Sequence, residues 1–257
     1  QMKHIYKLSI VLLAVFTFIG CNVDDDDAIT VLPMKELTAS FDKQVNVIAV
    51  ADDATRYDLV IKFSEALPSY STVEYSLDGG VTTLAASSQG DNSLVIPISF
   101  AATENSHTVS VSDFIVVNAA ARRFTTNFTG NTTVQMVRQG YFSAKMTWEG
   151  GQDLDLLFGT MSSGWAPGFL LDSSEGVTNE ENVSGSQLED GNYGMLVLEW
   201  PTNTFSQPVD ITFDIVTAGG SFTLTKNAVD FGFHWWGTKS TDADGNVTWI
   251  MHTEDPS

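Results

Sequence analysis

Apolar and polar residues alternate in short runs along most of the chain. The run at 72–77 alternates cleanly and leads into Asp78-Gly79-Gly80, which is a tight-turn signal. The run at 209–217 places its apolar residues on one face and its polar residues on the other. A period of two residues predicts β-strands. Runs with a helical period are hard to find, so the pattern predicts an all-β protein.

A first set of strand-like runs lies between residues 36 and 130. Pro97 interrupts one of these runs and predicts an edge strand, because proline has no N–H for a central ladder. Short strands separated by turn residues are typical of a β-sandwich. We therefore expect an immunoglobulin-like β-sandwich over 36–130. Its predicted strands lie at 45–50, 57–63, 72–77, 94–100, 108–117 and 123–128.

A second set of runs follows a short polar break at 129–131. The last two runs predict a hairpin whose turn region is Asp242-Ala243-Asp244-Gly245-Asn246. As a calcium loop, this segment would lack the third spaced ligand and the distal Glu. We expect a second β-sandwich over 131–257. Its predicted strands lie at 133–138, 141–148, 153–158, 193–200, 209–217, 221–225, 231–236 and 247–252.

The first twenty residues have the three parts of a signal peptide. Lys3 and Lys7 precede an apolar stretch at 8–19, and Gly20 then stands before Cys21. A helix needs about 20 apolar residues to span a bilayer, so this stretch is too short for a membrane span. It has the length of a signal-peptide core. We expect cleavage of residues 1–20.

Cys21 is the sole cysteine and ends the run Phe-Ile-Gly-Cys. The run resembles the lipobox of bacterial lipoproteins, with Phe18 where Leu is usual. The resemblance implies that Cys21 carries the lipid, whose buried methylenes each contribute about 0.8 kcal/mol to membrane anchoring. A buried free thiol is the alternative.

Four consecutive aspartates at 24–27 follow the cysteine. Such a charge run stays solvated, so we expect an acidic tether over 21–35. The pattern resembles the export signal of surface lipoproteins in Bacteroidota. That resemblance implies an outer-membrane lipoprotein facing the cell exterior. A plain soluble tether is the alternative.

Charge limits the partners of the protein. The formal net charge is −20, with 32 acidic and 12 basic residues. Nucleic-acid binding needs Lys and Arg to displace counterions, so nucleic acid is disfavoured, as is contact with anionic lipid headgroups. Cationic ligands, divalent cations and neutral sugars remain compatible with this charge as binding partners. The hydrophobic fraction of 43% supplies enough apolar surface for a folded core.

The second set of strands contains a family-like pattern. A strand ending in Trp148 precedes the Asp-Leu-Asp-Leu run at 153–156, a Glu-containing segment at 179–183 follows, and Gly191-Asn192-Tyr193 opens a later strand. Over about 141–225 this pattern resembles the bacterial pre-peptidase C-terminal family. The resemblance implies a jelly-roll-like β-sandwich that binds or adheres, sometimes with calcium, and performs no chemistry.

Four acidic residues form a candidate calcium site. Asp153 and Asp155 are two positions apart and share one face of a strand, while Leu154 shares the other face with the next leucine. Ca²⁺ prefers several oxygen ligands, and Glu180 and Glu181 could come from a neighbouring loop. The alternative is that the aspartates solvate the outer face of the sheet.

Four tryptophans are candidate ligand-binding residues. Trp235 and Trp236 are adjacent, so one should point outward, and Trp249 lies on the expected partner strand. Trp165 stands in a glycine-rich loop. An exposed indole beside polar groups can stack on a sugar ring. The alternative is that these rings pack in the core or at a domain interface.

Catalysis has little support in the sequence. Beyond the leader there are three histidines, His107, His234 and His252, and none has metal-ligand spacing with another ligand. No nucleophile elbow or phosphate-binding glycine loop occurs. We expect a non-catalytic surface lipoprotein that binds a glycan through its second sandwich. A protein-binding adhesin or assembly subunit is the second hypothesis. A glycoside-directed enzyme is the third, because a carboxylate pair could be hidden among the acids.

Overall fold

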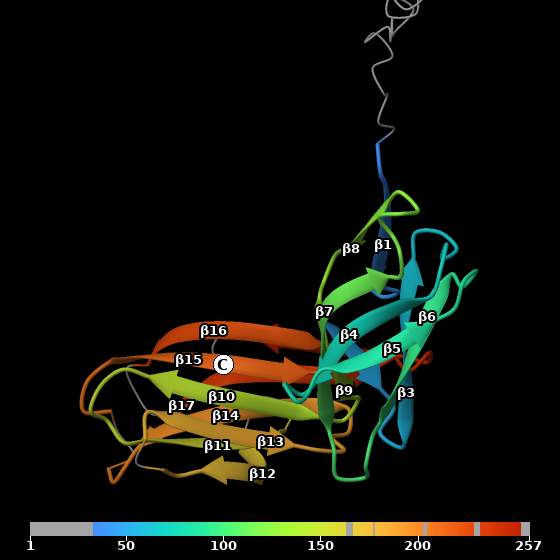
Figure 1. The fold of residues 1–257 in the computed structure, drawn as a ribbon. Helices are drawn as coiled ribbons and strands as arrows, with labels where there is room; N and C mark the ends of the chain where they lie inside the picture. The colour runs from blue at the N-terminus through green and yellow to red at the C-terminus, as the bar shows by residue number, and fades with distance from the viewer. Residues whose placement is uncertain (1–32, 163–166, 177, 203–204, 229–231, 253–257) are drawn as a thin grey trace, which may run out of the picture. The chain divides into compact units, whose positions relative to one another are not determined.

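The computed structural model describes residues 33–162, 167–176, 178–202, 205–228 and 232–252. Within these ranges the chain forms eighteen β-strands, which confirms the all-β prediction (Figure 1). No helix in the described ranges is long and apolar enough to cross a membrane. The leader, Cys21, the aspartates at 24–27 and Trp165 lie outside the described residues.

The first nine strands form two sheets with one core between them. One sheet has the order β6-β3-β1-β8 and the other β2-β9-β7-β4-β5. The core contains the inward-facing residues of both sheets, such as Phe41, Ile61 and Phe114. The strands are β1 (Lys35–Phe41), β2 (Val47–Val50), β3 (Arg56–Phe63), β4 (Ser71–Leu77), β5 (Thr83–Ser87), β6 (Ser93–Ser99), β7 (Ser106–Val116), β8 (Phe124–Phe128) and β9 (Thr133–Arg138).

The strand order is immunoglobulin-like. β1, β3 and β6 take the places of strands A, B and E, and β9, β7 and β4 take those of G, F and C. The first strand is split, because β2 leaves its sheet and pairs in parallel with β9. β6 carries Pro97 and is an edge strand, as predicted. The turn after Leu77 has positive φ at Asp78 and Gly79, as a tight hairpin requires.

The predicted boundary near residue 130 is wrong by one strand. β9, assigned from the sequence to the second sandwich, pairs with β7 and β2 of the first. Its Val134 and Met136 are fully buried in the first core. The polar break at 129–131 is the connection between β8 and β9. Without β9 the sheet would lose its ladders to β7 and β2, so the first sandwich extends to Arg138.

The last nine strands form the second sandwich. Its sheets have the orders β13-β10-β15-β16 and β12-β11-β14-β17-β18. We name them the polar sheet and the groove sheet, respectively. The strands are β10 (Phe142–Trp148), β11 (Leu154–Met161), β12 (Pro167–Ser174), β13 (Glu180–Gly185), β14 (Gly191–Glu199), β15 (Val209–Thr217), β16 (Gly220–Ala228), β17 (Gly232–Thr241) and β18 (Val247–His252).

The second sandwich has jelly-roll strand neighbours. Its strand pairs are antiparallel, and β16 and β17 occupy the positions that the first two strands take in a jelly roll. β17 and β18 form the predicted C-terminal hairpin. The Asp242 carboxylate accepts hydrogen bonds from the backbone N–H groups of Asp244 and Asn246, at 2.9 and 2.8 Å. The segment 242–246 is thus a hairpin turn.

Side chains join the two sheets at one open edge. Asp172 Oδ2 in β12 accepts a hydrogen bond from Ser184 N of β13 at 2.7 Å. Ser174 Oγ accepts one from Asn182 N at 3.2 Å. Edge strands normally leave such backbone groups unpaired. These contacts involve the C-terminal half of β12, whereas its first half, from Pro167 to Leu171, is exposed.

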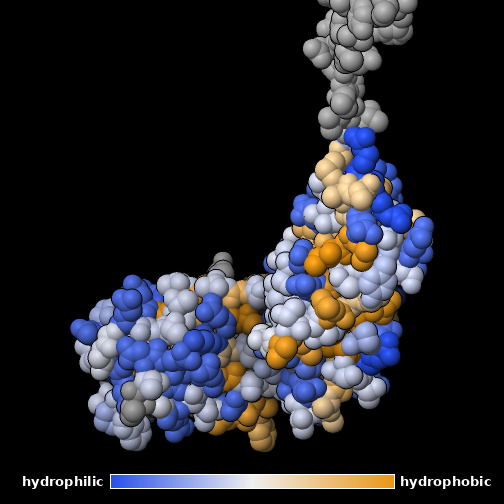
Figure 2. Space-filling model, viewed as in Figure 1, coloured by the Kyte–Doolittle hydropathy of each residue, from blue (hydrophilic) through white to orange (hydrophobic). Residues whose placement is uncertain are grey.

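The outer face of the polar sheet satisfies its own polar groups. Thr147 lies opposite Thr212, which lies opposite Thr225. Asp214 accepts a hydrogen bond from Thr223 Oγ1 at 2.7 Å. The visible face of β10, β13, β15 and β16 is hydrophilic almost throughout (Figure 2). This face has the character of a solvated surface. The outer face of the groove sheet, in contrast, carries exposed apolar side chains.

Candidate functional site

The predicted exposure of the paired tryptophans is wrong. Trp235 and Trp236 are each 1% exposed, and Trp249 is 6% exposed. Trp235 and Trp249 pack against Phe142, with ring centroids 5.1 and 5.5 Å away. The Lys226 ammonium lies 4.7 Å from the centroid of the Trp236 ring. Trp235 and Trp249 belong to the core of the second sandwich, and burial leaves none of the three indoles an open face for a sugar.

The predicted metal ligands divide between two places. Glu180 is exposed and pairs with Lys145 on the polar sheet, with Nζ 2.6 Å from its carboxylate. The hydrogen bond from Lys145 lowers the pKa of Glu180. Asp153 and Asp155 lie at the start of β11, and Glu181 of β13 accepts hydrogen bonds from Ser174 and Gly176. Glu180 therefore does not belong with the other three.

An acidic pocket opens at the start of β11. Asp153, Asp155, Glu175, Gly176 and Trp200 line a volume of about 220 Å³. Its carboxylates come from two segments that the sequence separates by twenty residues. We call this volume the acidic pocket.

Asp155 is the least solvated carboxylate of the acidic pocket. It is 7% exposed, and its carboxylate accepts no hydrogen bond from the described residues. Desolvation raises the pKa of Asp155 to about 6, and the nearby charges of Asp153, Glu175 and Glu181 act in the same direction. Asp153 Oδ1 is also buried, and no described residue donates a hydrogen bond to it. Buried carboxylates without partners are costly, so a cation would stabilise this pocket.

Trp200 is the functional candidate that the sequence reasoning missed. Its side chain is 61% exposed and lines the acidic pocket. Its backbone N–H donates to Asp153 O at 2.8 Å, which holds the indole beside the carboxylates. A signal was present in the sequence: Pro201 follows Trp200, and a residue before proline tends to leave regular structure. Trp200 thus follows the end of β14 at an exposed position.

The described residues do not form a complete metal site. Within them, no group of three or more His, Cys, Asp or Glu side chains is arranged to hold a metal ion. Glu181 Oε1 already accepts a hydrogen bond from Gly176 N at 2.9 Å, and its other oxygen accepts one from Ser174 Oγ. Asp153 and Asp155 are therefore the predicted ligands that remain available for a cation.

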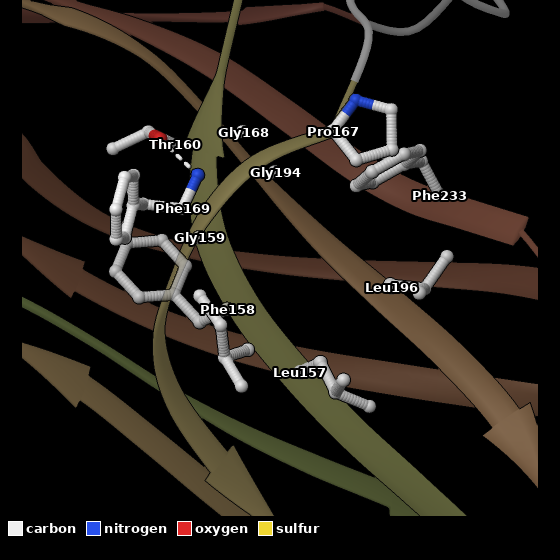
Figure 3. A pocket seen from close by; sticks show the side chains of 11 residues that line it. Leu157, Phe158, Gly159, Thr160, Pro167, Gly168, Phe169, Gly194, Leu196 and Phe233 are labelled. Atoms are coloured by element: carbon white, nitrogen blue, oxygen red, sulfur yellow. Dashed lines mark hydrogen bonds between the residues drawn. The ribbon is translucent and has the colours of Figure 1, made fainter.

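A second pocket on the groove sheet is apolar. Its volume is about 170 Å³, and none of the described residues that line it carries a charged side chain. Leu157, Leu196 and Phe233 contribute from β11, β14 and β17, and Pro167 and Phe169 contribute from β12 (Figure 3). We call it the apolar pocket.

Glycines allow the strands around the apolar pocket to approach closely. A Cβ on Gly159 would lie 2.5 Å from the carbonyl oxygen of Phe169, and one on Gly168 would lie 2.5 Å from Thr160 Oγ1. Thr160 Oγ1 accepts a hydrogen bond from Phe169 N at 2.8 Å (Figure 3). Any larger residue at 159 or 168 would push β12 away from β11.

The two pockets lie on the same face of the groove sheet. Asp155 pairs with Leu198, Leu157 with Leu196, and Gly159 with Gly194. Alternate residues of a strand share a face. Leu154, Leu156 and Phe158 fill the core, so the intervening residues face outward. The acidic pocket, the leucines at 157, 196 and 198 and the apolar pocket lie in one row along this face, and we call this row the groove.

The open half of β12 borders the apolar end of the groove. Phe169 is 82% exposed, Leu170 56% and Leu171 43%. Three consecutive exposed apolar residues on an edge strand are a marker of an interaction surface. The hydrogen bonds that protect the rest of β12 do not reach this half.

Comparisons with family models and with curated proteins find no match. Among solved structures, the apo form of the Calx CBD1 domain is 11% identical with a TM-score of 0.29, over 40% of this chain and 96% of that chain. CBD12 from CALX1.2 is 11% identical with a TM-score of 0.31, over 66% and 84%. The calcium binding domain CBD12 of CALX1.1 is 12% identical with a TM-score of 0.26, over 64% and 82%.

Proposed function

We propose that this chain is a non-catalytic, lipid-anchored surface protein that binds an extended protein segment along the groove of its second sandwich. The observation that carries this proposal is the exposed Phe169-Leu170-Leu171 run beside the apolar pocket. A pocket of this size accepts a single large apolar side chain.

The proposed location rests on the leader. Cys21 follows a signal-peptide-like stretch, and the aspartates at 24–27 resemble a surface-export signal. In this proposal the lipid on Cys21 holds the protein at the outer membrane, facing outward. Protease treatment of intact cells tests it: we expect cleavage of the mature protein, and full protection would contradict surface exposure.

Peptide selection tests the binding site. Libraries of linear peptides would be selected on the full chain, and the dissociation constants of enriched peptides would be measured. We expect Phe169→Ser to weaken binding by about tenfold or more, as for a buried aromatic anchor at an interface. Tyr70→Ser is the matched control, since Tyr70 is 50% exposed in the first sandwich. Equal binding by wild type and the Phe169 variant would contradict the proposal.

A glycan is the second candidate ligand, and Trp200 favours it. An exposed indole beside the carboxylates of Asp153 and Asp155 can stack on a sugar ring while the oxygens accept hydroxyl hydrogen bonds. Glycan arrays probed with wild type and Trp200→Ala test this candidate. Binding that depends on Trp200 would support it, and an array without signal for wild type would exclude the glycans displayed.

Calcium is the proposed cofactor of the acidic pocket. Asp153 and Asp155 would supply carboxylate oxygens, which Ca²⁺ prefers. Titration of CaCl2 into the full chain, followed by calorimetry and thermal unfolding, tests the proposal. We expect a rise in Tm that Asp155→Asn abolishes. An unchanged Tm at millimolar calcium would contradict it.

A further inference from the structure

We infer that the bound segment carries a cationic side chain, lysine or arginine, that enters the acidic pocket while an apolar side chain four residues away fills the apolar pocket. This inference rests on the proposed function, since it specifies the chemistry of the segment that the groove binds. Four observations on the groove sheet carry it.

The first observation is an unpartnered carboxylate aimed into a pocket. Asp155 is 7% exposed, lines the acidic pocket and accepts no hydrogen bond from the described residues. The charges that act on it, from Asp153, Glu175 and Glu181, are all negative. Lys145 and Lys239 are engaged with Glu180 and Asp190 instead. A ligand group that compensates the charge of this cluster is therefore positive.

The second observation is the indole at the rim. Trp200 is exposed and lines the same pocket as Asp155. A cation over an indole face gains further attraction from the electron-rich ring. Ammonium and guanidinium groups on long aliphatic stems can use both features, because the stem packs on the ring while the head meets the carboxylates. A pocket of about 220 Å³ has room for such a head group.

The third observation is the spacing of the two pockets. Asp155 and Gly159 are four residues apart on one strand, which is roughly 13 Å at the rise of an antiparallel strand. An extended ligand has the same rise and also places every second side chain on one face. Its residues i and i+4 therefore match the two pockets, and residue i+2 contacts Leu157, Leu196 and Leu198.

The fourth observation concerns the lining of the apolar pocket. Among the described residues, no charged side chain lines the apolar pocket. A cavity of about 150 Å³ lined by apolar groups holds a benzene-sized molecule. A phenylalanine or leucine side chain fits this pocket, whereas a second cation would be desolvated there without a partner.

Synthetic peptides test the inference. Three extended peptides share one scaffold and carry Phe with Lys at i+4, Phe with Gln at i+4, or Ala with Lys at i+4. Their dissociation constants for the full chain would be measured by fluorescence anisotropy. We expect the Phe/Lys peptide to bind about tenfold more tightly than the Phe/Gln peptide, and Asp155→Asn to remove that difference. Asp214→Asn, on the outer face of the polar sheet, is the matched control and should retain it.

The outcomes separate this inference from the proposed function. Equal binding of the Phe/Lys and Phe/Gln peptides, both sensitive to Phe169→Ser, would overturn the inference and leave the proposed function standing. Absence of binding by all three peptides would overturn both. Strong calcium binding that displaces the Phe/Lys peptide without weakening the Phe/Gln peptide would confirm that the acidic pocket is a cation site shared by both ligands. Thermal unfolding of each variant confirms that it is folded.

Discussion

Asp155 of β11 lies opposite Leu198 of β14, and the side chains of both residues face away from the core of the second sandwich. This pairing places a desolvated carboxylate at one end of an apolar stripe. Its neighbours Asp153 and Glu175 are also acidic, so their charges add to that of Asp155 instead of balancing it. The two ends of the groove therefore differ in charge: the acidic pocket lies at one end and the apolar pocket at the other.

Because the pKa of Asp155 is raised, its contribution to the free energy of unfolding should fall as the pH rises, the reverse of the usual behaviour of a carboxylate. The pKa of about 6 lies above its ordinary value of 3.8, since desolvation favours the protonated form in the folded state. Stability from this group is present below about pH 4 and is lost as the pH rises through about 6. Asp155→Asn should raise the free energy of unfolding by about 1–2 kcal/mol at pH 7 and leave it unchanged below about pH 4. Urea unfolding at both pH values measures this.

Glu180→Gln is the control for the pH experiment. The hydrogen bond from Lys145 lowers the pKa of Glu180, so its contribution is present at neutral pH and is lost as the pH falls. We expect this variant to shift stability in the opposite direction from Asp155→Asn. A pH-independent difference between Asp155→Asn and wild type would show that Asp155 does not titrate as described.

Arg138 should be essential to the stability of the first sandwich. Its buried guanidinium donates to the carbonyl oxygens of Glu104 at 2.7 Å and Ala101 at 3.0 Å, and to three carbonyls at 51–54. Arg138→Ala leaves these acceptors unpaired and should cost about 3–5 kcal/mol. Arg138→Lys should recover only part of this loss, because an ammonium cannot reproduce the planar fork. Chemical denaturation measures both, and equal stability of Lys and wild type would contradict the multiple-acceptor role.

The tryptophans should separate into structural and binding classes. Trp235→Ala removes a ring that is 1% exposed and should cost about 3–5 kcal/mol. Trp200→Ala removes an exposed ring and should change stability by no more than about 0.5 kcal/mol. We expect Trp200→Ala to weaken binding of the Phe/Lys peptide. Thermal unfolding and anisotropy on the same preparations measure both effects, and a large stability loss at Trp200 would contradict its exposed role.

Gly159 should control how close β12 lies to β11. The Cβ of an alanine at 159 would meet the Phe169 carbonyl oxygen, a backbone atom that cannot rotate away. Gly159→Ala should therefore cost about 1–3 kcal/mol and weaken peptides that use the apolar pocket. Gly191→Ala is the control, because a Cβ there meets no atom within 4 Å. Equal effects of the two variants would show that close strand approach is unimportant.

Local pattern was enough to predict most strands. The alternation at 209–217 became β15, with Ile211, Phe213 and Ile215 buried, since a sheet that buries one face forces a period of two. The C-terminal hairpin followed from its turn residues in the same way. The assignment of β9 failed, because strand order depends on partners distant in sequence. Val134 has the same local signature whichever sandwich it completes.

The sequence alone determined the all-β class, the strand-rich halves and the acidic character, because these depend on residue type and period. Only the tertiary structure decided which side chains share a surface. It buried Trp235, Trp236 and Trp249, exposed Trp200, and separated Glu180 from Asp155. The groove itself joins β11, β12, β14 and β17 through antiparallel pairing. Long-range register sets that arrangement, and register is a property of the folded sheet as a whole.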